Sequence, residues 1–226
     1  MSSQPWGQPR EPLTLKVMDA GRMPYAEALE LQLRLVEERR ENRIPDTLVL
    51  VEHPPVITMG RKATDGDILA PKAQLEAAGV EIHRITRGGE ATYHGPGQIV
   101  GYAIINLAAH QRKVRLFIER MEEVFVRLLD RHYAISARRD EEHRGVWVGN
   151  EKITAIGIAI TRGITMHGFA FNVAPDLSHF SWIVPCGIRD RGVTSLQALT
   201  GRTPDPETVK LQVVESFRTV YGYRDS

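Results

Sequence analysis

Hydrophobic residues in this chain follow two different periods, which together predict both helices and strands. Apolar positions three to four residues apart predict an amphipathic helix over 25–40, with Leu29, Leu33 and Val36 on one face. The segment 99–107 is apolar at nearly every position, which is typical of a strand buried on both of its faces. The chain is therefore expected to combine surface helices with a buried sheet.

Turn residues divide the rest of the chain into short elements. Gly149-Asn150 and Arg162-Gly163 break the β-rich region 146–173 into three runs, which predicts two consecutive hairpins. Asp205-Pro206 supplies an N-cap and a first helical residue for a last helix that ends near Tyr221. Other predicted elements are strands over 13–18, 47–51, 56–59 and 80–85, a long helix over 115–132, and brief helices over 71–78 and 194–199.

Hairpins with interspersed helices predict an α+β fold, in which flanking helices pack on a mixed, mostly antiparallel sheet. The length of 226 residues suits one domain, and the chain contains no repeat, low-complexity region or interdomain linker. The segment 1–12 is polar and rich in proline. We therefore expect a disordered N-terminal tail over 1–12 and a single domain over 13–226.

The composition of the chain argues against a membrane-spanning protein and against a general nucleic-acid-binding protein. Hydrophobic residues make up 42% and charged residues 25% of the chain, as in an ordinary globular protein, and no apolar run is long enough to span a bilayer. The net charge of +1 argues against broad nucleic-acid binding, which needs a concentrated basic face. One cysteine cannot form an internal disulfide, so we expect a reducing, cytoplasmic setting.

A glycine-rich loop is the first candidate for chemistry. Residues 87–98 read Arg87-Gly88-Gly89-Glu90-Ala91-Thr92-Tyr93-His94-Gly95-Pro96-Gly97-Gln98. An ordinary hairpin or bulge would account for one or two of these glycines. Four glycines and a proline exceed what one turn requires, and glycine allows close approach of the backbone to a ligand. We interpret this segment as a binding loop.

The single cysteine is the second candidate. Cys186 lies in Pro185-Cys186-Gly187-Ile188, and the flanking proline and glycine indicate a turn. A lone cysteine is most often a small buried hydrophobe, but this turn and the apolar segment 179–184 before it favour a nucleophile at the rim of a pocket. A thiol nucleophile needs a nearby cation or base, since few free thiols are ionised at neutral pH. Lys152, beside a turn, is a candidate for that role, although such lysines are usually solvated.

Two histidines complete the candidate constellation. His94 lies inside the glycine loop and His167 in the last predicted hairpin, although a lone histidine is more often structural than catalytic. The sequence has neither the ligand spacing of a zinc site nor a phosphate-binding P-loop. A thiol and a glycine-lined loop without metal or nucleotide motifs point to acyl transfer through a thioester.

Four stretches of the chain also match one known family, in the same order. They are the glycine loop 87–98, the strand that begins Lys152-Ile153, the segment Met166-His167-Gly168-Phe169-Ala170-Phe171-Asn172-Val173, and Pro185-Cys186-Gly187-Ile188. They resemble the octanoyltransferases of lipoate biosynthesis, also called lipoate-protein ligase B enzymes. The resemblance extends from about residue 19 to residue 199, so it covers nearly the whole chain.

The resemblance implies a catalytic domain with the biotin and lipoate ligase fold, no cofactor and no metal. It implies that Cys186 is the nucleophile that carries the acyl group and that Lys152 lowers the pKa of its thiol. His167 and Asn172 are expected to support the site. The substrate-binding residues that it implies are Arg87, Gly88, Gly89, Glu90, Ala91, Thr92, Tyr93, His94, Ala155, Ile156, Gly157, Gly168, Phe169 and Ala170.

The family's reaction implies particular partners. Octanoyl acyl carrier protein would be the donor, and lipoyl domains of 2-oxoacid dehydrogenase complexes and the glycine cleavage H protein would be the acceptors. The basic clusters Arg112-Lys113-x-Arg115 and Arg138-Arg139 are candidates for attracting an acidic carrier. An ATP-dependent lipoate or biotin protein ligase on the same fold is the alternative function, and a non-catalytic carrier-binding module is a second one.

Overall fold

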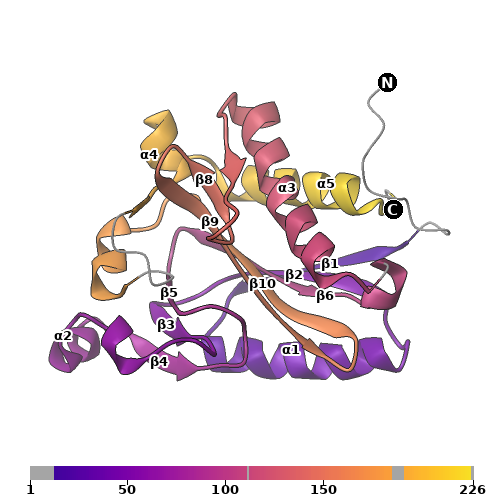
Figure 1. Cartoon of the computed structure of the whole chain (residues 1–226), viewed down its shortest axis with the longest axis horizontal. Helices are drawn as coiled ribbons and strands as arrows, with labels where there is room; N and C mark the ends of the chain where they lie inside the picture. The colour runs from indigo at the N-terminus through magenta and orange to yellow at the C-terminus, as the bar shows by residue number, and fades with distance from the viewer. Residues whose placement is uncertain (1–12, 111, 185–190, 225–226) are drawn as a thin grey trace.

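The computed structural model describes residues 13–110, 112–184 and 191–224, and a large mixed sheet lies at the centre of this part (Figure 1). In spatial order the strands are β1 (Leu15–Arg22), β2 (Asp46–Glu52), β6 (Gln98–Ile104), β10 (Ile164–Asn172), β9 (Glu151–Thr161), β8 (Val146–Val148) and β7 (Arg138–Arg139), while β11 (Gly192–Val193) also pairs with β9. The pairs β1–β2 and β9–β11 are parallel, and the other neighbouring strands of this sheet are antiparallel.

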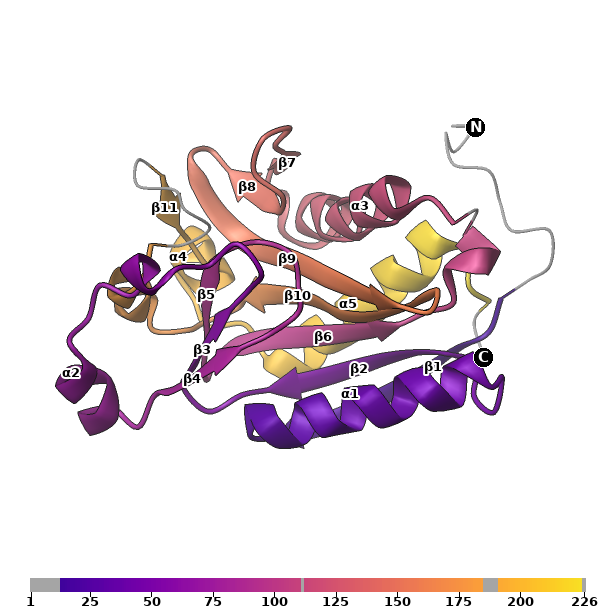
Figure 2. The same cartoon turned by 60° about the horizontal axis from the view of Figure 1, so that its bottom comes forward.

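Helices cover both faces of the large sheet. α3 (Val114–Tyr133) and α5 (Pro206–Tyr221) pack on one face, and α1 (Tyr25–Arg40) packs on the other (Figures 1 and 2). Alternation along β2 shows how one strand serves both layers, because Leu48 and Leu50 join the α3–α5 core whereas Val49 and Val51 join the α1 core. The central strand β6 is buried along its whole length, as predicted for the apolar run 99–107, but it ends at Ile104 and Leu107 already begins a 3-10 helix.

A small second sheet stands beside the large one. Its strand order is β4 (Glu81–Arg84), β3 (Val56–Met59) and β5 (Ala91–His94). A third hydrophobic cluster lies on this sheet and includes Leu75 of α2 (Lys72–Ala77) and Trp182 of the 3-10 helix η3 (Leu177–Trp182). The remaining short elements are α4 (Leu196–Thr200), η1 (Asp65–Asp67) and η2 (Leu107–His110).

The structure confirms the α+β prediction, the helix over 25–40 and both hairpins. It also confirms the start of the last helix, where the Asp205 side chain accepts a hydrogen bond from the Thr208 backbone N–H. The predicted face of α1 is partly wrong, because Leu33 is 54% exposed while Gln32 is fully buried. The register of α1 on the sheet turns Tyr25, Ala28, Gln32, Leu35 and Val36 inward.

Two other differences concern strands. Residues 91–94 were expected inside a loop, but they form β5 because they pair with β3. The first strand runs from Leu15 to Arg22, further than its apolar residues suggest, because it pairs with β2. The predicted tail, residues 1–12, lies outside the described residues, and the single-domain division stays a prediction. Within the described ranges, the helices are too short or too polar to cross a membrane.

Candidate functional site

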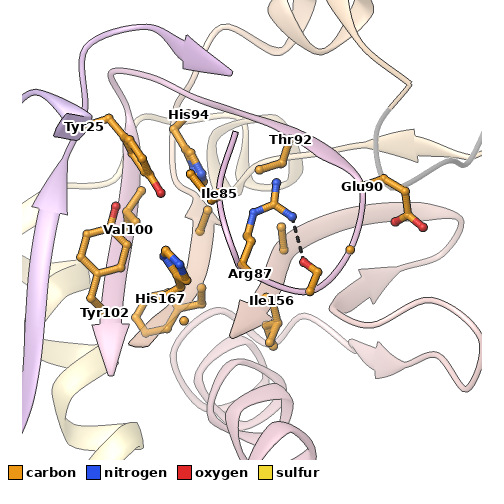
Figure 3. A pocket seen from close by; sticks show the side chains of 17 residues that line it. Tyr25, Ile85, Arg87, Glu90, Thr92, His94, Val100, Tyr102, Ile156 and His167 are labelled. Carbon is orange, nitrogen blue, oxygen red and sulfur yellow. Dashed lines mark hydrogen bonds between the residues drawn. The ribbon is translucent and has the colours of Figure 1, made fainter. Parts of the chain in front are cut away.

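A narrow cavity of about 60 Å³ lies where the glycine loop and β5 meet β9 and β10 (Figure 3). The predicted substrate-binding residues that line it come from three separated segments of the chain. Twelve of the fourteen predicted substrate-binding residues line it: Arg87, Gly88, Gly89, Glu90, Thr92, His94, Ala155, Ile156, Gly157, Gly168, Phe169 and Ala170. Antiparallel pairing of Gly157 with Gly168 brings the second and third segments together.

The other two predicted residues, Ala91 and Tyr93, face away from this cavity. They lie on β5, where neighbouring side chains point to opposite faces, so Thr92 and His94 take the cavity side. Ala91 and Tyr93 instead pack in the third hydrophobic cluster. The Tyr93 hydroxyl lies 2.8 Å from Nδ1 of His179 in that layer.

Backbone hydrogen bonds hold the glycine loop between two neighbours. The Gly88 N–H donates to the Ile158 carbonyl of β9 at 3.1 Å, and the Lys62 N–H donates to the Gly89 carbonyl at 3.1 Å. Gly89 has a φ of +86°, and a Cβ atom on Gly60 would lie 2.3 Å from the Gly89 oxygen. These positions require glycine, because a side chain would strain the backbone or collide with it.

Arg87 fixes the same loop to the small sheet. Its side chain is buried, and Nη2 donates to the Thr58 carbonyl at 2.7 Å and to Thr58 Oγ1 at 3.0 Å. Nη1 donates to the carbonyl of Gly88 at 3.0 Å, as Figure 3 shows. The guanidinium thus cross-links β3 and the loop while placing a positive charge at the cavity wall.

Aromatic and imidazole side chains gather on one side of the cavity (Figure 3). Burial raises the pKa of Tyr25 to about 12, and the Tyr102 hydroxyl lies 2.6 Å from Nε2 of the buried His53. Burial chiefly lowers the pKa of His167 to about 4, with the Arg87 charge acting in the same direction. Burial likewise holds the pKa of His94 well below its usual value. Both imidazoles are therefore neutral at pH 7.

Tyr25 and Tyr102 belong to this cavity, but sequence reasoning did not select them. Tyr25 starts a helix and Tyr102 lies in a buried strand, so neither is part of a recognisable motif. His167, which was selected, has a φ of +60° inside β10, and its backbone N–H donates to Gln32 Oε1 at 2.8 Å. Positive φ at a residue with a side chain stores strain, and such residues cluster at functional sites.

Lys152 lies in a second, adjoining cavity of about 780 Å³. The segment Gly88–Glu90, Ile156 and Gly157 line both cavities and therefore form the wall between them. Only 6% of Lys152 is exposed, and its ammonium lies 4.8 Å from the centre of the Trp147 ring, which is a cation–π contact. Lys152 is thus a buried residue of β9 rather than a solvated one.

Cys186 lies outside the described residues. The described chain resumes at Arg191, and β11 then pairs with the strand that carries the lysine, with Val193 opposite Lys152. The Thr194 N–H donates to the Lys152 carbonyl at 3.0 Å. The segment that follows the cysteine motif is therefore attached beside Lys152.

Asn172 connects strands rather than lining either cavity. Its Oδ1 accepts from Gln98 Nε2 at 2.8 Å, and its Nδ2 donates to the Thr194 carbonyl at 2.9 Å. It therefore ties β10 and β6 to the segment that follows β11. Within the described ranges, no cluster of three or more His, Cys, Asp or Glu side chains is arranged to hold a metal ion.

Comparisons with known proteins agree with this geometry. Residues 24–218 match the family model of the lipoyl protein ligase A/B catalytic domain. The octanoyltransferase of Alkaliphilus metalliredigens is 48% identical over 209 residues, which are 92% of this chain and 96% of that protein. The sequence resemblance is thereby confirmed over most of the chain.

Solved structures show the same fold at low identity. LipL1 of P. falciparum in complex with lipoate has a TM-score of 0.73 at 14% identity, and the match covers 92% of this chain and 62% of that longer chain. Biotin protein ligase from Aquifex aeolicus in complex with biotin and ATP has a TM-score of 0.57 at 14% identity and covers 92% and 70%. The fold is that of lipoate and biotin ligases.

Within that fold class, the chain belongs to the octanoyltransferases of the lipoyl protein ligase A/B catalytic domain family. It is accordingly an acyltransferase.

Proposed function

We propose that this chain moves an octanoyl group from octanoyl acyl carrier protein to Cys186 and then to a lysine of a lipoyl domain. The acceptors would be the lipoyl domains of 2-oxoacid dehydrogenase complexes and the glycine cleavage H protein. One observation carries the proposal: twelve expected substrate-binding residues line one cavity, and five of them also line the adjoining cavity that contains the buried Lys152. A reaction that depends on a free thiol suits a reducing, cytoplasmic compartment.

The walls of the first cavity suit an alkyl chain. Ile85, Val100 and Phe169 contribute apolar surface, and the glycines allow a chain to pass close to the backbone. His94 and His167 are neutral at pH 7, so they add no charge that an acyl chain would have to desolvate. The octanoyl group is therefore expected in this cavity, with its carbonyl toward the side of Lys152.

The chemistry then needs two displacements. The Lys152 ammonium stabilises the Cys186 thiolate, which attacks the donor thioester, and the departing carrier thiolate takes a proton from Lys152. The neutral Lys152 amine next accepts a proton from the ammonium of the acceptor lysine. The acceptor amine attacks the acyl-enzyme, the amide forms with loss of one proton to solvent, and Cys186 leaves as thiolate.

This sequence of steps consumes no ATP. Exchange of one thioester for another is nearly balanced, and conversion of a thioester into an amide is downhill. An ATP-dependent ligase on the same fold would instead activate a free acid as an acyl-adenylate and would not need a cysteine. The two functions therefore differ in donor, in nucleotide requirement and in covalent intermediate.

Intact-mass analysis tests the proposal directly. Incubation with octanoyl acyl carrier protein should add one octanoyl mass, and hydroxylamine should remove it because thioesters are labile to that nucleophile. Since Cys186 is the sole cysteine, Cys186→Ala should abolish both the adduct and transfer to a lipoyl domain. Full activity of that variant would exclude the thioester route. Activity with free octanoate and ATP, but none with the carrier donor, would establish the ligase instead.

A further inference from the structure

The second cavity is a groove along β9 that includes the proposed catalytic lysine. Lys152 and the stretch Ile156 to Ile160 of β9 line it, and Lys152 and Ile160 are about 26 Å apart along the strand at roughly 3.3 Å per residue. Its floor is apolar, and Val114 at the start of α3 and Ile160 are 38% and 40% exposed beside it. A groove of this length extends well beyond what one thioester group would occupy.

The groove also carries an excess of positive charge. Among the described residues that line it, Arg61, Lys62, Arg144 and Lys152 are cationic, whereas Glu90 and Glu142 are the carboxylates. Arg144 is partly neutralised, since its Nη1 lies 3.5 Å from Oε2 of the buried Glu122. Arg61 and Lys62 are exposed and form no ion pair with any residue in the described ranges. They are therefore the cations available to an anionic ligand.

Backbone contacts place this pair well away from Lys152. Lys62 is hydrogen-bonded to Gly89, and the preceding Gly88 is hydrogen-bonded to Ile158. Ile158 lies six residues beyond Lys152 on β9, about 20 Å along the strand at roughly 3.3 Å per residue. A ligand that touches both Lys152 and the Arg61–Lys62 pair must therefore be long and carry its negative charge far from its reacting end.

The donor of the proposed reaction has this chemistry. Its thioester sits at the end of a phosphopantetheine arm, a long chain with amide groups whose other end is a phosphodiester. We propose that the groove binds this arm, with Arg61 and Lys62 pairing with the phosphodiester; the inference rests on the proposed function. The acyl group enters the first cavity, the thioester lies beside Lys152, and the arm follows the apolar floor of β9 toward Arg61 and Lys62.

The basic clusters selected from the sequence are less suited to this role. The Arg115 Nε atom already lies 2.8 Å from Glu119, and Arg138 pairs with Asp140 at 3.1 Å. A phosphate at these two arginines would have to replace their intramolecular partners, and no residue of either cluster lines the groove, whereas Arg61 and Lys62 line it and form no ion pair within the described ranges. Loss of a phosphate contact at two exposed cations is expected to weaken binding about tenfold.

The test compares three octanoyl donors that differ in one feature each: the acyl carrier protein, free octanoyl-phosphopantetheine and free octanoyl-pantetheine. For the wild type, kcat/KM should be about tenfold higher with the phosphorylated small donor than with the unphosphorylated one. Arg61→Ala/Lys62→Ala should abolish this preference by raising KM for the phosphorylated donors. The variant should transfer from octanoyl-pantetheine at the wild-type rate, which also shows that it is folded.

A charge-matched double variant serves as control. Arg43→Ala/Lys72→Ala removes two exposed cations outside the groove and should keep the preference for the phosphorylated donor. Equal kcat/KM for both small donors in the wild type would overturn the inference while leaving the proposed function intact. So would an Arg61→Ala/Lys62→Ala variant that raises KM for the lipoyl-domain acceptor alone, because the groove would then hold the acceptor. No transfer from any octanoyl donor would refute the proposed function and this inference with it.

Discussion

The hydrogen bonds that the Arg87 guanidinium donates should hold the glycine loop in place. Arg87→Lys tests this, because it removes the guanidinium but retains the positive charge. The two terminal nitrogens of Arg87 donate three hydrogen bonds to Thr58 and Gly88 from a buried position. A lysine ammonium can reach one acceptor group but cannot span both segments. The variant therefore leaves buried carbonyl oxygens of the loop and of β3 without their donors.

Hydrogen bonds to a charged group contribute roughly 1.5–3 kcal/mol each, and leaving a buried acceptor unpaired adds a cost of similar size. Loss of two of the three bonds, reduced by local relaxation, should lower the free energy of unfolding by about 3 kcal/mol. In urea this corresponds to a shift of the midpoint by roughly 1 M for a chain of this size. Because the loop also forms the cavity wall, kcat/KM for the octanoyl donor should fall by about 100-fold.

Urea unfolding followed by tryptophan fluorescence measures the first quantity, and steady-state transfer to a lipoyl domain measures the second. Arg84→Lys is the matched control, because Arg84 is 59% exposed and its ion-pair partner Asp65 is 93% exposed. That substitution should change the free energy of unfolding by less than about 0.5 kcal/mol. If Arg87→Lys behaves like this control in both assays, the loop does not depend on the guanidinium fork.

Three further predictions concern other parts of the site. Lys152→Ala should raise the pKa of the Cys186 thiol toward about 8.5. Lys152→Arg should preserve the reactivity of the thiol with iodoacetamide at pH 7 but should fail in turnover, since a guanidinium cannot exchange the proton. Identical alkylation profiles and turnover in the wild type and both variants would exclude Lys152 from the mechanism. In Gly157→Ala the new Cβ atom would lie 3.2 Å from both Arg87 Cδ and the Gly88 oxygen, so kcat/KM should drop about tenfold with little change in Tm. In the control Gly66→Ala the new Cβ atom meets only an ordinary contact at 3.6 Å, so kcat/KM and Tm should both stay unchanged. Because the pKa of His167 is about 4 in the folded protein and about 6.5 in the unfolded chain, the unfolded state alone takes up a proton between those values. The contribution of His167 to the free energy of unfolding is therefore fully present above pH 6.5, and it falls by about 3 kcal/mol as the pH drops to 4. His167→Gln should remove this part of the dependence of the unfolding free energy on pH, measured by urea titrations at several pH values. An unchanged pH dependence would contradict a buried neutral imidazole.

The sequence by itself determined most of the elements and most residues of the cavity. Local periods distinguish helices from strands, and glycine and proline mark where the chain must turn, so the helix over 25–40 and the two hairpins were predicted correctly. The glycine-rich loop 87–98 was also recognisable from the sequence alone, because it has more glycines than an ordinary hairpin requires. These features depend on neighbours along the chain.

Only the tertiary structure decided which of those residues meet. Whether Leu33 or Gln32 faces the sheet depends on how α1 is rotated against β6 and β10, and local hydrophobicity does not encode that rotation. Pairing of β5 with β3 sends Tyr93 away from the cavity. Tyr25 enters it from a helix that lies more than sixty residues earlier in the chain.

The position of Lys152 shows the same limit most clearly. Lysines beside turns are usually solvated, but Lys152 is buried, with the Trp147 ring and the parallel strand β11 next to it. Burial of a charged side chain depends on contacts between segments that only the folded chain brings together, so its cause is absent from the local pattern. The sequence therefore supplies the candidate groups, and packing between distant segments decides which of them share a site.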